Sequence, residues 1–118
     1  MAPDPAPDPA PDLADRLRAA IRDEPGLTER RMFGSLAFLV HGNLAVSAGR
    51  DGDLMVRTDP SRTQQLLREP GAHPFEMHGR SMRGWLGIDG DAVTSEEDLA
   101  RWAEVGVGYA RRLPPKKG

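Results

Sequence analysis

The side chains with the most obvious chemical potential are the histidines and serines, and their spacing matches no catalytic pattern. The three histidines, His41, His73 and His78, lack the close helical pairing that zinc hydrolases use. Ser35 and Ser81 lie outside a Gly-x-Ser-x-Gly turn, and no acidic partner can be assigned to either. The sequence contains no cysteine, which removes thiolate catalysis and thiolate metal ligands. We therefore expect surface or turn histidines, no catalytic residue, no metal site and no cofactor, and we do not expect an enzyme.

The arginines offer a second kind of chemistry, the binding of anions. Arg30 and Arg31 form one pair, and Arg80 and Arg83 form another in a separate segment. A strand meander could bring the two pairs together into a patch that accepts phosphate groups, which nucleic-acid binding requires. Acidic residues are interspersed with these arginines, so a solvated charged surface is the favoured interpretation. The four arginines remain the candidate binding residues.

The charge balance gives little support to nucleic acid as the main partner. The formal net charge is −2, and Asp4, Asp8 and Asp12 all precede the first basic residue, Arg16. Removing these three acids leaves the rest of the chain near +1. A strongly basic balance is what would indicate nucleic-acid binding by itself.

The first residues of the chain differ in composition from the rest. Residues 2–12 repeat Ala-Pro-Asp-Pro, which predicts a disordered, solvated tail over residues 1–12 and a folded domain over residues 13–115. The composition, 38% hydrophobic and 29% charged, is that of a soluble globular protein. No apolar run approaches the roughly 18 residues of a membrane span, and the N-terminus is not a signal peptide. We expect a cytoplasmic protein without membrane contact.

The elements that must position these residues begin with a predicted antiparallel meander between Thr28 and Val56. Its short apolar runs are separated by glycine turns, which predicts three or four strands. His41-Gly42-Asn43 is the expected hairpin turn, because glycine and asparagine tolerate positive φ. Two more short strands are expected at about residues 75–78 and 84–88, around a connection over 79–83.

Three helices are predicted around these strands. The first follows Asp12 and ends at Pro25-Gly26, which cannot continue a helix. The second starts at Asp59-Pro60, an N-cap followed by proline at the first helical position, and runs to about Arg68.

The third helix is the clearest in the sequence. Thr94 and Glu97 have the spacing of a capping box, and Trp102 lies near the middle of the apolar face that follows. We expect Trp102 in the core. The order of elements predicts an α+β fold, an antiparallel sheet in α-β(3–4)-α-β(2)-α order with the helices packed on one face.

Several segments taken together resemble one known family. They are Arg31-Met32-Phe33-Gly34 and Gly79-Arg80-Ser81-Met82-Arg83-Gly84-Trp85, with the His41-Gly42-Asn43 turn between them. On these residues the chain resembles the TfoX/Sxy N-terminal domain family over about residues 13–115, as a stand-alone single-domain member. The motif positions that the resemblance implies are Arg31, Met32, Phe33, Gly34, Gly42, Gly79, Arg80, Met82, Gly84 and Trp85. It also implies a fold similar to secretion chaperones.

The resemblance gives the functional expectation, because the family includes regulators of natural competence that act on transcription. We expect a non-enzymatic module that acts by protein contact, as a homodimer, in transcriptional or competence-related regulation. A small antiparallel sheet with exposed edges and one weakly covered face favours self-association. The alternative is a protein that binds nucleic acid directly through the arginine patch.

Overall fold

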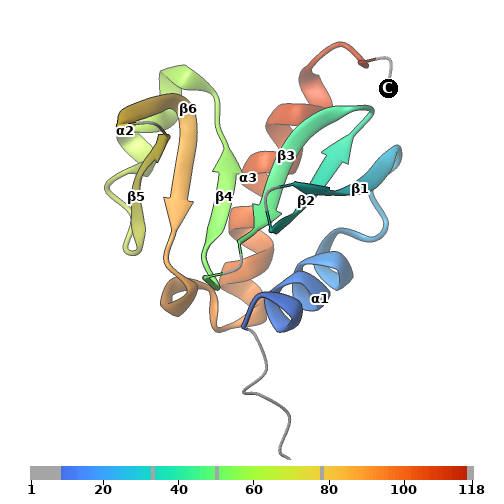
Figure 1. Ribbon diagram of the computed structural model, residues 1–118. Helices are drawn as coiled ribbons and strands as arrows, with labels where there is room; N and C mark the ends of the chain where they lie inside the picture. Colours follow the sequence, from blue (N-terminus) through green and yellow to red (C-terminus); the bar gives the residue numbers. More distant parts are fainter. Residues whose placement is uncertain (1–8, 33, 50, 78, 117–118) are drawn as a thin grey trace, which may run out of the picture.

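The computed structural model describes residues 9–32, 34–49, 51–77 and 79–116. Phe33, one of the family-motif positions, and His78, expected at the surface or in a turn, lie outside the described residues. Within the described part the fold is α+β, as predicted, with an antiparallel sheet and helices on one side of it (Figure 1). No helix in these ranges is long and apolar enough to cross a bilayer.

Six strands make up the described sheet, in the spatial order β1-β2-β3-β4-β6-β5, and all neighbours are antiparallel. The bounds of the strands are β1 Leu27–Met32, β2 Ser35–Val40, β3 Asn43–Ala48, β4 Leu54–Arg57, β5 Ala72–Met77 and β6 Arg80–Ile88. The predicted meander is therefore present with four strands. The turn between β2 and β3 lies at the predicted place but consists of His41 and Gly42, both at positive φ, while Asn43 already begins β3. The hairpin β5–β6 is longer than predicted, because β5 already begins at Ala72 and β6 at Arg80.

Two long helices, α1 (Pro9–Ile21) and α3 (Glu96–Arg112), lie on the same face of the sheet (Figure 1). α3 packs mainly on β3 and β4, and α1 packs on α3 and β3. α1 begins at Pro9, before the expected start at residue 13. The cap of α3 is also one residue later than predicted, since the Ser95 hydroxyl, not that of Thr94, accepts from the Asp98 amide at 3.0 Å.

The segment between β4 and β5 is less helical than the sequence suggests. It contains a single 3₁₀ turn, η1 (Pro60–Arg62), followed by the short α2 (Thr63–Leu66). The predicted start is correct, because the Asp59 carboxylate accepts from the Ser61 amide at 2.9 Å and Pro60 follows the cap. The predicted end at Arg68 is wrong, since the α-helix stops at Leu66. A second 3₁₀ turn, η2 (Gly90–Val93), connects β6 to α3.

The core lies between the sheet and the two long helices. Trp102 of α3, Phe38 of β2 and Leu17 of α1 are each fully buried there, so the prediction that Trp102 is a core residue is confirmed. Its indole Nε1 is buried and finds no hydrogen-bond partner in the described residues. Gly106 sits where α3 comes closest to β3, because a Cβ at this position would lie 2.3 Å from the Ala45 carbonyl oxygen.

Candidate functional site

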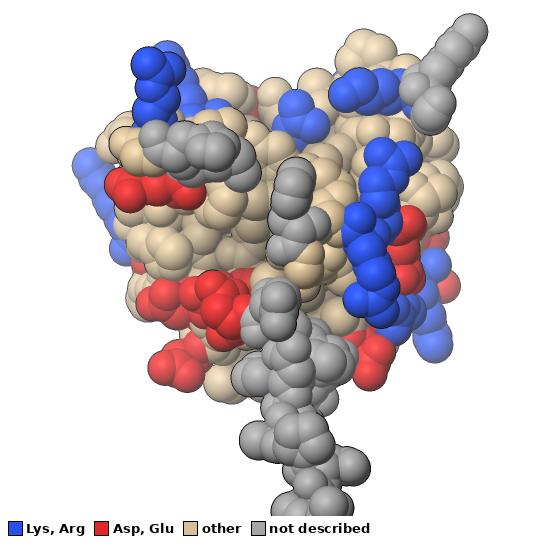
Figure 2. Space-filling view, viewed as in Figure 1, with Lys and Arg blue, Asp and Glu red and all other residues tan. Residues whose placement is uncertain are grey.

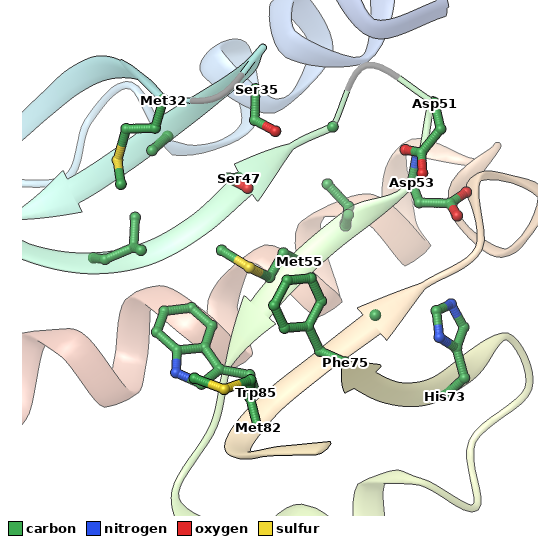
Figure 3. A pocket seen from close by; sticks show the side chains of 15 residues that line it. Met32, Ser35, Ser47, Asp51, Asp53, Met55, His73, Phe75, Met82 and Trp85 are labelled. Atoms are coloured by element: carbon green, nitrogen blue, oxygen red, sulfur yellow. The ribbon is translucent and has the colours of Figure 1, made fainter. Parts of the chain in front are cut away.

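The face of the sheet opposite α1 and α3 carries a hollow of about 570 Å³ (Figure 3). Each of the six strands contributes to its lining. We call this surface the open face. Its large apolar residues are Met32, Leu44, Met55, Phe75, Met82 and Trp85, and its polar residues are Ser35, Ser47, Asp51, Asp53 and His73. Leu54 also borders the hollow, although its side chain belongs to the core.

Strand alternation explains why these side chains face the hollow. In β4, Leu54 and Val56 belong to the core, so Met55 between them must point to the other face. In β6, Leu86 and Ile88 are buried in the core, and Trp85 lines the hollow. The same sequence alternation therefore builds a packed face and an open face from one sheet.

The open face keeps several large apolar side chains partly accessible to solvent. Met55, Phe75 and Trp85 are half-buried. Met82 is 37% exposed and is the one large hydrophobic residue classed as exposed among the described residues. Apolar patches that remain open to solvent mark interaction sites. Methionine suits such a surface because its flexible, polarizable side chain adapts to different partners.

Arg57 makes a cation–π contact with Trp85, which lines the hollow. Its guanidinium carbon lies 5.4 Å from the centre of the Trp85 ring and 5.7 Å from that of Tyr109, both within range of a cation–π interaction. Its Nη1 also donates to the carbonyl oxygen of Leu44 at 3.3 Å. These contacts orient the Trp85 ring in the unbound protein.

The other end of the hollow is acidic. Asp51 and Asp53 line it beside His73, and Figure 2 shows acidic side chains gathered below the tan surface of this face. Asp51 Oδ1 accepts from the Asp53 amide at 3.0 Å, and Asp53 Oδ1 accepts from the Gly90 amide at 2.9 Å. Each carboxylate therefore accepts a backbone amide hydrogen, and Arg57 lies at the far end of the same strand, β4.

The predicted arginines do not form one cluster. Arg30 and Arg31 are neighbours in β1, and strand alternation sends their side chains to opposite faces; Met32, two residues after Arg30, lines the hollow. Arg80 and Arg83 are exposed on β6. β2, β3 and β4 lie between β1 and β6, which separates the two strands by about 19 Å at the usual strand spacing.

Three family-motif residues line the hollow, whereas none of the four predicted arginines is among its lining residues. Met32, Met82 and Trp85 come from two separate sequence motifs and line the same cavity. Gly84 is buried at a φ of +86°, and its carbonyl oxygen accepts from the Thr58 amide at 2.7 Å. Sequence reasoning missed Met55, although its place between two core residues of β4 is a signal that could have found it.

Carboxyl groups with shifted pKa values lie away from the hollow, at the margins of the helices. A hydrogen bond from Arg111 of α3 lowers the pKa of Glu24, and one from Arg18 of α1 lowers that of Glu29. The Ser61 amide, which Asp59 caps, lowers the pKa of Asp59. These shifts are explained by ion pairing and capping and do not indicate acid–base catalysis.

Comparison with known proteins identifies the family. No curated protein and no solved structure matches the chain. Residues 19–110 match the family described as TfoX N-terminal domain, which covers the strands, α3 up to Ala110 and the open face. The chain belongs to the TfoX N-terminal domain family.

Proposed function

We propose that this protein acts by protein contact and that the open face binds the apolar side of an amphipathic helix from a partner protein. The observation that carries the proposal is the hollow itself, because an apolar cavity of about 570 Å³ lies on a sheet face that no described helix covers. Burying such a surface against a partner is favourable in proportion to the apolar area removed from water.

The shape of the open face supports a helical partner. An α-helix with its side chains is about 10–12 Å across, and the hollow lies over β3 and β4 between walls from β1 and β2 on one side and β5 and β6 on the other. A convex helix fits a concave sheet face, and helix-in-groove binding is a recurrent mode of peptide recognition. Met32, Met55 and Met82 would be the adaptable contacts.

Charge at one end of the hollow supports one orientation of the helix. Asp51 and Asp53 border that end, and Arg57 is the last residue of β4, at the opposite end of the strand. A helix with basic residues near Asp51 and Asp53 would complement this arrangement, since complementary charges fix register and orientation.

Family membership supports the biological side of the proposal. The TfoX N-terminal domain family is non-catalytic and regulatory in type. We infer that the chain serves transcriptional or competence-related regulation through its partner. It would do so without an enzymatic reaction.

Site-specific photo-crosslinking in the native host tests the protein contact. A benzoylphenylalanine residue replaces Met55 in one variant and Ala100, which is exposed on α3, in the control. We expect the variant at residue 55, but not the control, to form a covalent adduct whose cross-linked peptide belongs to an amphipathic helix. No adduct at residue 55, or equal adducts at both positions, would contradict the proposal.

One other outcome of this experiment corresponds to another function. An adduct between two copies of the chain would replace the helix with the homodimer expected from the sequence, and light scattering after size-exclusion chromatography would then show twice the chain mass.

A separate measurement tests direct nucleic-acid binding through Arg30, Arg31, Arg80 and Arg83. Such binding would appear as an increase in the fluorescence anisotropy of duplex DNA that falls steeply with salt.

A further inference from the structure

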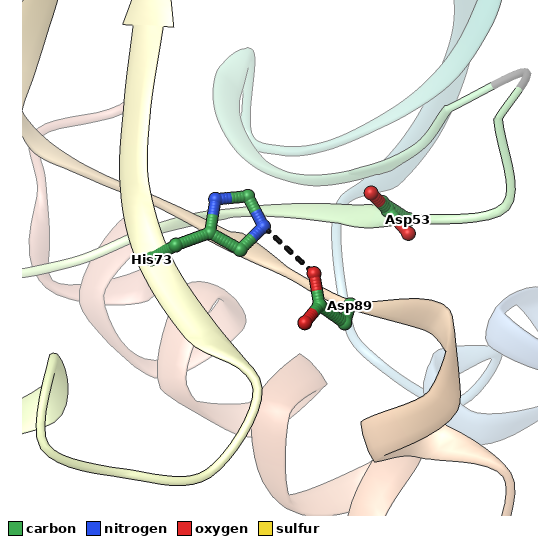
Figure 4. A group of neighbouring side chains, drawn as sticks. All are labelled: Asp53, His73 and Asp89. Atoms are coloured by element: carbon green, nitrogen blue, oxygen red, sulfur yellow. Dashed lines mark ion pairs between the residues drawn. The ribbon is translucent and has the colours of Figure 1, made fainter.

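We propose that Asp53, His73 and Asp89 form a binding site for a divalent transition-metal ion of the Zn²⁺ class. One ligand atom from each residue lies within 4.8 Å of the others (Figure 4). The three residues precede β4, lie in β5 and follow β6, and these strands are neighbours because β6 pairs with both β4 and β5. Asp53 and His73 also line the open face, so the ion would lie at its acidic end, and the test below measures metal binding without a partner protein.

The position of His73 is fixed by its surroundings. Its ring lies over Gly87 of β6, where a Cβ would come within 2.3 Å of the ring carbon Cε1. The absence of a side chain at residue 87 therefore makes room for the imidazole. His73 can reach the two carboxylates only because this position is glycine.

The hydrogen bonding of His73 is compatible with a metal ligand. Its Nδ1 lies 3.3 Å from the carbonyl oxygen of Pro74, so a hydrogen on Nδ1 can be donated there. Its Nε2 lies 3.1 Å from Asp89 Oδ1, the distance of a hydrogen bond or ion pair. A metal ion bound by both atoms would take the place of a proton on Nε2. A histidine that binds a metal through one nitrogen and donates the other N–H to a backbone carbonyl has the same arrangement.

The two carboxylates are positioned to complete the site. The Gly90 amide donates to Asp53 Oδ1 at 2.9 Å, and the second oxygen of this carboxylate can bind an ion. The Asp89 amide donates to the Gly71 carbonyl oxygen at 2.9 Å, which anchors the backbone after β6. The Asp89 and His73 side chains are 57% and 44% exposed, so an ion can enter from solvent.

The charges around the cluster favour a cation as well. Asp51 and Asp91 border the adjoining depression together with Asp53 and Asp89. Arg16 is the basic residue that borders it, and its guanidinium donates to Glu96 Oε1 at 2.8 Å and to the Val93 carbonyl oxygen at 2.8 Å. This arginine is therefore engaged with other acceptors.

The donor set indicates the class of ion. One imidazole nitrogen and two carboxylate oxygens suit Zn²⁺ better than Ca²⁺ or Mg²⁺, which prefer oxygen ligands alone. Tetrahedral Zn²⁺ with bonds of about 2.0–2.2 Å places its donors roughly 3.4 Å apart. The 3.1 Å between His73 Nε2 and Asp89 Oδ1 is close to this spacing, and Asp53 must move inward by side-chain rotation. Three protein ligands leave a fourth position for water.

Calorimetric titration of the full chain with Zn²⁺, after chelator treatment and dialysis, tests the site. We expect one ion per chain. His73→Gln and Asp53→Asn should each weaken Zn²⁺ affinity by at least about 100-fold, the upper range for changes of groups that only support a ligand. His41→Gln, in the β2–β3 turn, and Asp91→Asn, an exposed acid beside the cluster, are the matched controls and should bind Zn²⁺ like the parent.

Nitrogen NMR of the parent protein gives a second readout that does not depend on the folding of a variant. Addition of Zn²⁺ should shift the Nε2 resonance of His73, while Nδ1 keeps its proton. The proposal is overturned if the parent binds no Zn²⁺, if His73→Gln and Asp53→Asn bind as well as the controls, or if the His73 resonances do not respond.

Discussion

The two faces of the sheet are built from alternate residues of the same strands but have different compositions. On the face under α1 and α3, Leu54, Val56, Leu86 and Ile88 are almost completely buried. On the open face, Met55, Trp85 and His73 are partly exposed, and charged groups border the hollow. The covered face is apolar and closed, so it supplies stability. The open face keeps apolar and polar groups accessible, as a binding surface requires.

This comparison predicts that substitutions on the two faces separate stability from binding. Changes under the helices should lower the free energy of unfolding. Changes on the open face should alter binding and leave stability nearly unchanged, because surface substitutions away from special features usually have small effects.

The largest loss of stability is expected for Trp102→Ala, on the covered face. The indole is fully buried, and its removal leaves a cavity for which about 3–5 kcal/mol is typical. Denaturant unfolding followed by far-UV circular dichroism measures the change. Trp102→Phe should cost much less, because it keeps most of the packing and removes an Nε1 donor that lacks a partner in the described part of the chain. A Trp102→Ala protein as stable as the parent would show that this face is not the core.

Gly106→Ala should have the second largest effect. The added Cβ would meet the Ala45 carbonyl oxygen at 2.3 Å, so α3 must move away from β3, at a cost of about 1–3 kcal/mol. Gly108→Ala is the control, because its nearest contact is Glu104 Oε2 at 3.1 Å, the end of a flexible side chain. This control should be neutral or slightly stabilising, since alanine favours a helix. Equal effects at the two glycines, measured by urea unfolding, would argue against close packing of α3 on β3.

A smaller loss of stability is expected when the ion pair between Glu24 and Arg111, in the last turn of α3, is removed. Arg111 donates to both carboxylate oxygens of Glu24, at 2.9 and 2.8 Å, and the Glu24 side chain is only 11% exposed. Glu24→Gln should cost about 1 kcal/mol at neutral pH. Asp23→Asn is the control, because this neighbouring acid is exposed and makes no ion pair within the described residues.

The same pair predicts a pH dependence. Arg111 lowers the pKa of Glu24 below its ordinary value of 4.5. The stabilisation is therefore complete above pH 4.5 and is lost as the pH falls through the lower pKa of the folded state. Urea unfolding between pH 7 and pH 3 should show that the difference between the parent and Glu24→Gln shrinks with acid. A difference that stays constant down to pH 3 would mean that the ion pair does not contribute.

The smallest effect on stability is expected for Met82→Ser, on the open face. Met82 is 37% exposed, so the change in unfolding free energy should stay within about 0.5 kcal/mol. Differential scanning calorimetry can measure it. A loss comparable with that of Gly106→Ala would mean that the open face is part of the structural core.

Local patterns made much of the covered face predictable from sequence. The turn at His41-Gly42 and the start at Asp59-Pro60 are dictated by residues next to each other in the chain. The apolar face that buries Trp102 follows helical periodicity. The cap of α3 lies one residue later than predicted because Thr94 and Ser95 are both good N-cap residues, and the local sequence does not distinguish between them.

The open face was harder to predict because it depends on contacts between distant segments. Met55 alternates with two core residues, but its exposure follows only from the absence of a helix on that side within the described structure. His73 approaches Asp53 and Asp89 because β6 is inserted between β4 and β5, an order that spacing along the chain does not reveal. The sheet order also separates Arg30 on β1 from Arg80 on β6, because β2, β3 and β4 lie between them.

The central claim, that the covered face stabilises and the open face binds, is tested most directly by comparing the two tryptophans. Trp85→Ala and Trp102→Ala are introduced separately, and unfolding free energy and cross-linking from residue 55 are measured for both. Our account predicts that Trp85→Ala stays folded with a much smaller loss of stability than Trp102→Ala but loses the partner adduct. If Trp85→Ala is as destabilised as Trp102→Ala, or remains stable and forms the adduct as the parent does, the account is contradicted.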